Sequence, residues 1–226
     1  MPPRSRTSTG KAAKAESAAK GLRLRKPKAP DIHDIVVVGA GLAGLAQARM
    51  LQQRGFTTHL IDPRERDSLR APSADRRATA LTPASVQLLD LPVDWLAAKG
   101  QRIESIVVDA GLAPALSEDE ALRLSSGAWV VGNADLYAFL VEHTVLDGRF
   151  GQAVTGSRVE AGRRRLTMAS GDPVEARVVV AADGRNSILR REDGIQRQQQ
   201  DFRQIALTGV IRHEDPHAGR AFQRFL

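Results

Sequence analysis

The chain has 226 residues and no cysteine, which excludes disulfides, thiolate zinc sites, iron–sulfur clusters and a cysteine nucleophile. Its longest apolar run, Ile35–Ala46, is interrupted by glycines and is shorter than the roughly 20 residues that a membrane-spanning helix needs. The formal net charge is +7, which raises the question of whether the chain binds an anionic partner.

The excess positive charge lies at the N-terminus. Residues 1–30 hold nine of the 33 Lys and Arg residues and one of the 26 acidic residues, so this segment carries +8 and the remainder −1. Leu22 and Leu24 are its only large aliphatic residues, and we therefore predict that residues 1–31 form a disordered basic tail. The tail could aid solubility, contact anionic lipid or nucleic acid, or serve as a presequence. The absence of aromatic residues among its charges argues against nucleic acid.

Regular structure is expected from Asp31 onward. Ile35–Val38 is a β-branched run typical of a buried parallel strand, and Gly39, Gly41 and Gly44 follow it with the spacing G-x-G-x-x-G. In this pattern the first glycine allows a tight turn, the second lets a pyrophosphate approach the backbone, and the third lets helix and strand pack closely. A helix should follow, because large apolar residues recur on one face of it.

A second strand is expected at Phe56–Ile61, and Asp62 stands at its end. An acidic side chain at this place can accept hydrogen bonds from the ribose hydroxyls of an adenosine, and it argues against a 2′-phosphate there. Strand, glycine fingerprint, helix and acid together predict a dinucleotide site. These residues do not distinguish NAD from FAD, because both contain the same adenosine diphosphate.

The rest of the chain does not repeat this strand–helix unit. We expect a helix capped by Thr82 with Pro83 at its first position, and a strand followed by a helix within Ala128–Val145. Further strands are expected at Arg102–Gly111, Val154–Glu160, Arg163–Ala169, Val174–Ala181 and Gln204–Arg212. The pattern predicts an α/β fold, in which a Rossmann-like parallel sheet is interleaved with antiparallel strands of a second domain.

The dipeptide Asp183-Gly184 comes directly after the predicted strand Val174–Ala181. Asp-Gly is a common hairpin turn, but the residues that follow, "RNSILRRE", are typical of a polar cap and a helix. We therefore predict a turn from strand to helix, which is a setting that binds phosphates. The alternative for Asp183 is a plain helix cap.

The sequence resembles the FAD-dependent aromatic hydroxylases, and among them the hydroxylases of ubiquinone biosynthesis. Four segments carry the resemblance in the family's order, and "PHAGRAFQRFL" near the end resembles the strand that follows in the ubiquinone branch. They are the glycine fingerprint with "LIDPRE", then "DRRATAL", "GNADLYAFL" and "ADGRNSILR". The resemblance covers about residues 32–226.

The resemblance implies cofactor contacts that the residues alone do not give. Arg77 is expected to contact the flavin or the pyrophosphate, and Asn133 the diphosphate, although a solvated arginine and an ordinary N-cap are the alternatives. Asp183 and Gly184 are expected beside the pyrophosphate and along the path of NAD(P)H.

The resemblance also implies the reaction. FAD would be the cofactor, NAD(P)H and O₂ the co-substrates, and a phenolic or polyprenylated intermediate of ubiquinone biosynthesis the substrate. Flavin chemistry needs no metal, and no catalytic acid or base is assigned. We expect a cytoplasmic protein that could touch the membrane through its basic tail and could meet other quinone-biosynthesis proteins. Another flavin hydroxylase or reductase of this fold, or a non-catalytic dinucleotide-binding module, are the competing hypotheses.

Family members continue beyond the region that this sequence matches. We therefore expect an N-terminal part of a hydroxylase, apparently truncated at the C-terminus. Residues 32–100 and 132–200 are expected to form a discontinuous FAD-binding domain, and residues 101–131 and 201–226 part of the substrate domain.

Overall fold

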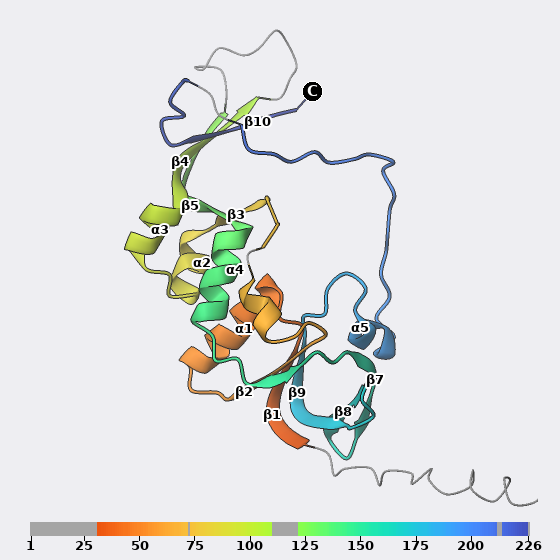
Figure 1. The fold of residues 1–226 in the computed structure, drawn as a ribbon. Helices are drawn as coiled ribbons and strands as arrows, with labels where there is room; N and C mark the ends of the chain where they lie inside the picture. The colour runs from red at the N-terminus through yellow and green to blue at the C-terminus, as the bar shows by residue number, and fades with distance from the viewer. Residues whose placement is uncertain (1–30, 72, 110–121, 212–213, 226) are drawn as a thin grey trace, which may run out of the picture.

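The computed structural model describes residues 31–71, 73–109, 122–211 and 214–225. Residues 1–30 of the predicted basic tail therefore lie outside the described residues, whereas Asp31 already begins the first strand. The described chain forms a six-stranded sheet and a four-stranded sheet, with helices α1 to α4 between them in Figure 1. This confirms the predicted α/β fold with interleaved sheets.

The six-stranded sheet has the order β6-β2-β1-β9-β8-β7. Its strands β6, β2, β1 and β9 run parallel, whereas β8 is antiparallel to β9 and to β7. The strands are β1 (Asp31–Val38), β2 (Thr58–Asp62), β6 (Gly148–Phe150), β7 (Val154–Glu160), β8 (Arg163–Met168) and β9 (Val174–Ala181). The carboxyl ends of β1, β2 and β9 therefore meet at one edge of the sheet.

Strand β1 lies at the centre of this sheet and is buried on both faces. Val37 packs into a core with Leu60 of β2 and with helices α1 and α4, whereas Val36 and Val38 face the second core beside β8, β9 and α5. Side chains of a strand alternate between its two faces, so only a continuous apolar run can fill both cores. The β-branched residues of β1 meet this demand.

The helices pack on both faces of the six-stranded sheet, because the last short helix contributes to the second core and all the others contribute to the first. They are α1 (Leu42–Gln53), the single 3₁₀ turn η1 (Asp67–Arg70), α2 (Pro83–Leu88), α3 (Val93–Lys99), α4 (Asn133–Glu142) and α5 (Ile188–Glu192). Thr82 caps α2 as predicted, because its hydroxyl accepts the backbone N–H of Ser85 at 3.2 Å. Gly55 follows α1 with φ +83°, as the predicted helix end requires.

One arginine of α1 joins the ends of two other helices. Arg49 donates from Nε to the carbonyl oxygen of Leu89 at 2.9 Å and from Nη1 to that of His143 at 2.8 Å. Its Nη2 lies 3.3 Å from the carbonyl oxygen of Asp90. These carbonyls belong to the C-terminal ends of α2 and α4, which carry partial negative charge, so Arg49 holds both helices against α1.

The second sheet has the order β10-β4-β5-β3, and its strands are β3 (Ala78–Leu81), β4 (Gly100–Asp109), β5 (Leu122–Gly132) and β10 (Arg220–Arg224). Strand β5 is antiparallel to β3 and β4, and β10 runs parallel to β4. Helix α4 starts directly after β5. The end of this sheet therefore lies close to the fingerprint helix α1, which packs against α4.

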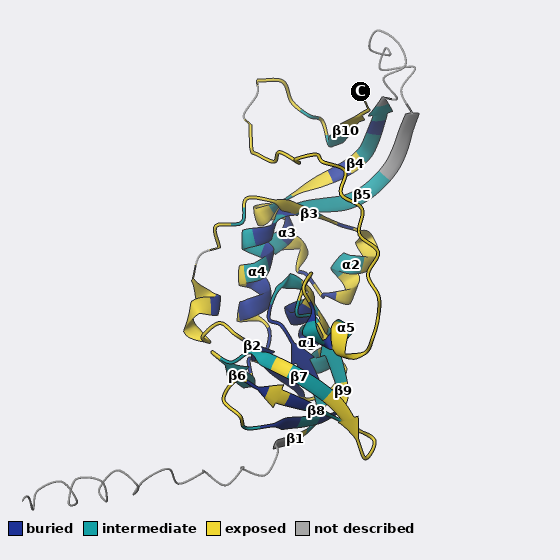
Figure 2. Cartoon of the chain, turned by 90° about the vertical axis from the view of Figure 1, so that its right-hand side faces the viewer, coloured by how far each residue is buried: buried dark blue, intermediate teal, exposed yellow. Residues whose placement is uncertain are grey.

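The predicted strand Gln204–Arg212 is wrong. Residues 204–211 form neither helix nor strand and are exposed, with Ile205 at 88% and Leu207 at 94%, along the extended run between α5 and β10 in Figure 2. An apolar alternation makes a strand only when a neighbouring strand accepts its hydrogen bonds, and no described strand lies beside this segment. The second strand of the fold also starts later than predicted, at Thr58, because the backbone N–H of Phe56 still donates to the carbonyl oxygen of Leu51 in α1 at 3.1 Å.

A histidine pair lies where β1 and β2 pair, away from the carboxyl edge of the sheet. The rings of His33 and His59 stack with centroids 3.9 Å apart, and His59 Nδ1 lies 3.4 Å from Asp147 Oδ2. Burial lowers the pKa of His59 and the adjacent His33 lowers it further, although Asp147 opposes both effects. His59 is therefore held neutral below the pH at which a free histidine gains its proton.

Candidate dinucleotide site

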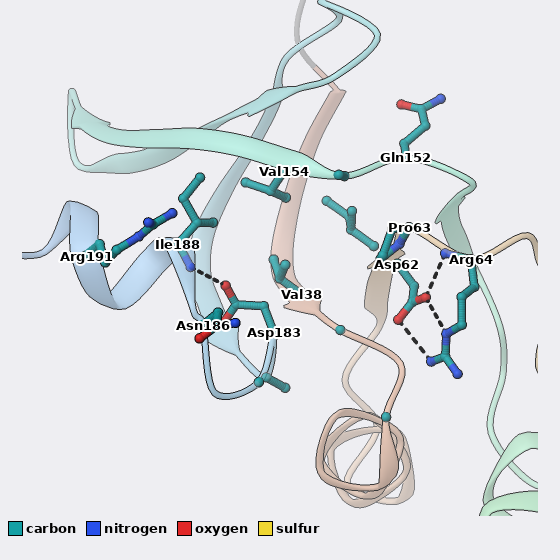
Figure 3. Close-up of a pocket in the computed structure, with 16 residues that line it drawn as sticks. Val38, Asp62, Pro63, Arg64, Gln152, Val154, Asp183, Asn186, Ile188 and Arg191 are labelled. Carbon is teal, nitrogen blue, oxygen red and sulfur yellow. Dashed lines mark hydrogen bonds and ion pairs between the residues drawn. The ribbon is translucent and has the colours of Figure 1, made fainter. Parts of the chain in front are cut away.

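A cavity of about 540 Å³ opens at the carboxyl edge of β1, β2 and β9. The fingerprint lines one wall, Asp62 another, and the turn at Asp183 and Gly184 a third. Figure 3 places Asp62 and Asp183 on either side of Val38, the last residue of β1. Because the strand order reverses around β1, this is the place where open α/β sheets bind their ligands.

Two of the fingerprint glycines are required by the backbone itself. Gly39 has φ +103°, and a side chain there would overlap the carbonyl group of Ala182 at the end of β9. A side chain at Gly44 would overlap the carbonyl oxygen of Gly39, so this glycine lets α1 approach the strand, as predicted. The backbone therefore requires glycine at both positions even when no ligand is bound.

Gly41 is different, because a Cβ atom there would meet no protein atom within 4 Å and its φ is an ordinary −76°. The residue is the N-cap of α1, and no side chain caps this helix. The first turn of α1 therefore presents backbone N–H groups and the positive end of the helix dipole toward open space. An anion such as a pyrophosphate fits this arrangement.

Asp62 ends β2 as predicted, and four donors hold its carboxylate. Oδ2 accepts from the backbone N–H of Ala40 at 2.6 Å and from Arg64 Nη2 at 3.2 Å. Oδ1 accepts from the backbone N–H of Arg64 at 2.9 Å and from its Nε at 2.8 Å. Burial alone would raise the pKa of Asp62, but these hydrogen bonds outweigh it and the pKa lies below its ordinary value. The group is ionised and can only accept hydrogen bonds.

The turn after β9 leads into helix α5, as predicted, and not into a hairpin. Gly184 has φ +84° and no atom near the place of a Cβ. Asp183 Oδ2 accepts the backbone N–H of Ile188 at 2.8 Å, while the N-cap of α5 is Ser187. Asp183 therefore supports the start of the helix with one oxygen. Its other oxygen, Oδ1, is buried without a hydrogen-bond partner.

A second hollow of about 490 Å³ adjoins the first and shares Gly41 and Arg64 with it. Arg77 and Asn133 both line it. Asn133 is the first residue of α4 and not its N-cap, which is Gly132, so the alternative of an ordinary cap is wrong. Seven of the eight predicted cofactor residues thus line the two adjoining hollows, and the eighth, Gly44, packs against the backbone of Gly39.

Asp75 organises this second hollow. Its carboxylate accepts from Arg77 Nε at 2.8 Å, from Arg77 Nη2 at 2.7 Å and from Asn133 Nδ2 at 3.0 Å. The Asn133 carbonyl oxygen accepts from the Thr79 hydroxyl at 2.6 Å. The hydrogen bonds from Arg77 and Asn133 hold the pKa of Asp75 far below its usual range. Asp75 thereby fixes the guanidinium and the amide side by side.

Three residues of the site were not predicted from the sequence. Arg64 binds Asp62, Asp75 binds Arg77 and Asn133, and Tyr137 lines the second hollow with its ring beside the Arg64 guanidinium. Arg64 and Asp75 both stand inside the segments "LIDPRE" and "DRRATAL" that carried the family resemblance. Their position in these segments could have identified Arg64 and Asp75 as site residues, but their hydrogen-bond partners are set by the tertiary structure.

A βαβ unit with a glycine-lined helix N-terminus, an acid at the end of its second strand and a cavity between them defines a Rossmann-type dinucleotide-binding domain. Comparison with known families identifies the dinucleotide, because the FAD-binding domain family matches residues 33–223. The chain belongs to this family. The predicted family and the predicted FAD cofactor are confirmed.

Curated proteins that are similar to the chain include two hydroxylases. Ubiquinone hydroxylase UbiL of Rhodospirillum rubrum is 32% identical over 88% of this chain and 48% of its own length. The 3-demethoxyubiquinol 3-hydroxylase of Escherichia coli K12 is 28% identical over 85% of this chain and 51% of its own length. The chain thus spans about half the length of these two relatives.

Solved structures support the fold. The p-nitrophenol 4-monooxygenase PnpA of Pseudomonas putida superposes with a TM-score of 0.58 at 18% identity, over 74% of this chain and 44% of its own. A probable FAD-dependent monooxygenase, pqsL of Pseudomonas aeruginosa, superposes with a TM-score of 0.58 at 17% identity, over 76% of this chain and 48% of its own.

Among the helices that the structure describes, none has the length and apolar character needed to cross a membrane.

Proposed function

We propose that the chain is the FAD-binding part of a monooxygenase that hydroxylates a polyprenylated phenolic intermediate of ubiquinone biosynthesis, with NAD(P)H and O₂ as co-substrates. The single observation that carries the proposal is the cavity between the fingerprint, Asp62 and Asp183 in a chain of the FAD-binding family. The names of the two curated relatives support the substrate class.

Each site residue has a proposed part in holding FAD. The pyrophosphate would lie at the N-terminus of α1, where Gly41 leaves the backbone open, and the adenosine ribose would donate to Asp62. Gly39 and Gly44 hold the turn and the helix in place. The unpartnered Oδ1 of Asp183 supports a donor from a ligand beside Gly184, since a buried carboxylate oxygen without a partner is costly.

Arg77 and Asn133 would act on the other side of Gly41. The bidentate contact with Asp75 fixes the Arg77 plane, and Arg77 retains an exposed side chain that a phosphate could reach. Asn133 is tied by both ends of its amide, which gives it one orientation. The pair would therefore meet the cofactor with little loss of side-chain entropy on binding.

Bound FAD would supply the hydride acceptance and the oxygen transfer that no side chain can perform. The residues of this chain would bind and orient it: donors at the α1 terminus for the pyrophosphate, an acceptor for the ribose, and apolar walls such as Val38, Val154 and Ile188 around the cavity. No catalytic acid or base is assigned to the chain.

The second sheet is our proposed part of the substrate domain. We propose the boundaries 32–100 and 132–200 for the FAD-binding domain, and 101–131 and 201–226 for the partial substrate domain. The separate sheet that contains β4, β5 and β10 supports this division. Strand β3 comes from the first FAD-binding segment but pairs with β5, so the two proposed domains are joined through a shared sheet.

We further propose that the protein is cytoplasmic and touches anionic membrane through residues 1–30, whose charge of +8 would favour this contact. A polyprenylated substrate is itself membrane-associated, which supports a protein that can reach the bilayer surface. Other proteins of quinone biosynthesis are proposed partners for the same reason.

The hydroxylation is tested by loading the purified chain with FAD, adding NAD(P)H, O₂ and a polyprenylated phenol, and measuring product by mass spectrometry. A product that gains one oxygen atom, and that depends on both FAD and NAD(P)H, would support the full activity. Oxidation of NAD(P)H that yields only hydrogen peroxide would limit the chain itself to cofactor binding. A chain that neither gains the yellow colour of FAD nor oxidises NAD(P)H would contradict the proposal.

A further inference from the structure

We propose that the side chain of Arg64 occupies the ribose position at Asp62 while the site is free, and that the adenosine ribose of FAD must displace it. This inference rests on the proposed FAD site and adds to it an internal competitor. Its basis is the full set of donors around one carboxylate.

The carboxylate of Asp62 has no acceptor position to spare. A carboxylate offers about four lone-pair positions. Two are taken by the backbone N–H groups of Ala40 and Arg64, at 2.6 and 2.9 Å, and these donors are fixed by the strand end and the turn. The other two are taken by Nε and Nη2 of the Arg64 side chain, at 2.8 and 3.2 Å. A ribose can therefore bind Asp62 only by replacing the guanidinium donors.

The two kinds of donor are alike in geometry. Nε and Nη2 point their N–H groups in the same direction and reach the two oxygens of one carboxylate, one each. The 2′- and 3′-hydroxyls of a ribose form a comparable pair, since they stand on adjacent carbons. The guanidinium also shields the acid, because the Asp62 side chain is 5% exposed whereas that of Arg64 is 46% exposed. In Figure 3 the Arg64 head group lies directly against Asp62.

The second hollow can accept the Arg64 side chain when it leaves Asp62. It lines both hollows of the site, and its guanidinium carbon lies 5.6 Å from the ring centroid of Tyr137, a cation–π distance. A rotation of the side chain toward the second hollow would free both Asp62 oxygens, and it would also break the hydrogen bond that Nη2 donates to the carbonyl oxygen of Ala40 at 2.9 Å.

The competition should weaken binding of a ribose by the free-energy difference between the two sets of hydrogen bonds. The ion pair that has to open is partly exposed, and such a pair contributes enough to change an equilibrium by about two- to fivefold. Removal of the guanidinium should therefore tighten binding of a ligand with a ribose diol by this factor. A ligand that lacks the diol gains nothing, because it does not use Asp62.

The test compares the dissociation constants of ADP and of 2′,3′-dideoxy-ADP for three variants of the chain by titration calorimetry. Arg64→Met removes the competing donors. Arg64→Lys keeps the charge but cannot donate to both oxygens from one planar group. Arg66→Met is the matched control, because Arg66 lies on the same loop, carries the same charge and contacts the ring of Phe150 instead.

We expect the dissociation constant of ADP to fall about two- to fivefold in Arg64→Met and less in Arg64→Lys, with no change in Arg66→Met. The constant for dideoxy-ADP should be equal in all four proteins. Weaker ADP binding by Arg64→Met, with unchanged thermal unfolding in the absence of ligand, would overturn the inference and make Arg64 a ligand contact. ADP binding by the wild-type chain without any gain in the variants would overturn the inference alone. Failure of every protein to bind ADP would contradict the FAD site itself and the inference with it.

Discussion

The three fingerprint glycines should respond differently to a side chain, and Gly41→Val separates ligand binding from folding. The Cβ of the new valine would meet no protein atom within 4 Å, and the φ angle of −76° at Gly41 is one that any residue can adopt. The expected loss in unfolding free energy is about 1 kcal/mol, because valine is a poor N-cap. In a chain of this size that shifts the melting temperature by about 2–4 °C.

Affinity for FAD should be lost far beyond this change in stability, since the valine would fill the space in which the pyrophosphate approaches the helix. Gly44→Val should behave in the opposite way. Its side chain would overlap the carbonyl oxygen of Gly39, and the cost should be about 3 kcal/mol or more in unfolding free energy, whether or not FAD is present.

Urea unfolding without ligand and fluorescence titration with FAD measure the two quantities separately. Gly209→Val is the matched control, because Gly209 also has open space at the Cβ position but lies on the exposed run before β10. It should leave both quantities unchanged. FAD affinity of Gly41→Val within twofold of the wild type would refute the placement of the pyrophosphate at α1.

Three further predictions concern the rest of the molecule. The pKa of His59 in the fold is below its ordinary value of about 6.5, so below pH 6.5 the unfolded chain binds more protons than the folded chain. The contribution of His59 to stability should therefore be complete above pH 6.5 and decrease as the pH falls. The difference between the urea midpoints at pH 8 and at pH 5 should become smaller in His59→Gln. An equal decrease in the variant would assign the effect to other groups. Arg49→Met should lower the unfolding free energy by about 1–3 kcal/mol. Arg54→Met should lower it much less, because among the described residues the Arg54 side chain donates to the carbonyl oxygen of Met50 within the same helix. Similar losses in the two variants would contradict the role of Arg49 at two helix ends. Deletion of residues 1–30 should abolish sedimentation with anionic vesicles without changing FAD affinity, since each basic residue near such a surface contributes about 1 kcal/mol to binding. Equal sedimentation of the full and the shortened chain would contradict the membrane contact and favour a role of this segment in solubility.

The parts of the site that local sequence could predict are those that local backbone geometry creates. Gly39, Gly44 and the helix start at Gly41 follow from one continuous strand–turn–helix segment. The structure gives Gly39 and Gly44 the physical reasons expected of them and leaves open space at Gly41. The same holds for the turn from β9 to α5, where "RNSILRRE" after Asp183-Gly184 indicated a helix cap.

The pairings around Asp62 and Asp75 could not be predicted in this way. Asn133 reaches Asp75 across 58 residues of sequence, and Thr79 reaches Asn133 across 54, because β3 and β5 lie side by side in the second sheet. Arg64 is only two residues from Asp62, but nothing in the spacing shows that its side chain folds back onto the acid. Such contacts depend on tertiary packing, which single-sequence patterns do not contain.

The failed prediction at residues 204–211 has a related cause. The alternation of apolar residues there matches a strand, yet the backbone has no neighbouring strand in the described structure, and the apolar side chains remain exposed. Periodicity reports which side chains could share a face, whereas a strand also needs a partner for its backbone.

The central claim is that this chain holds the adenosine diphosphate half of FAD between the α1 N-terminus and Asp62, and a crystal structure of the chain soaked with FAD tests it most directly. The account predicts pyrophosphate oxygens within hydrogen-bond distance of the backbone around Gly41, and ribose hydroxyls donating to the Asp62 carboxylate. Electron density for FAD in another part of the molecule, or a ribose turned away from Asp62, would contradict it.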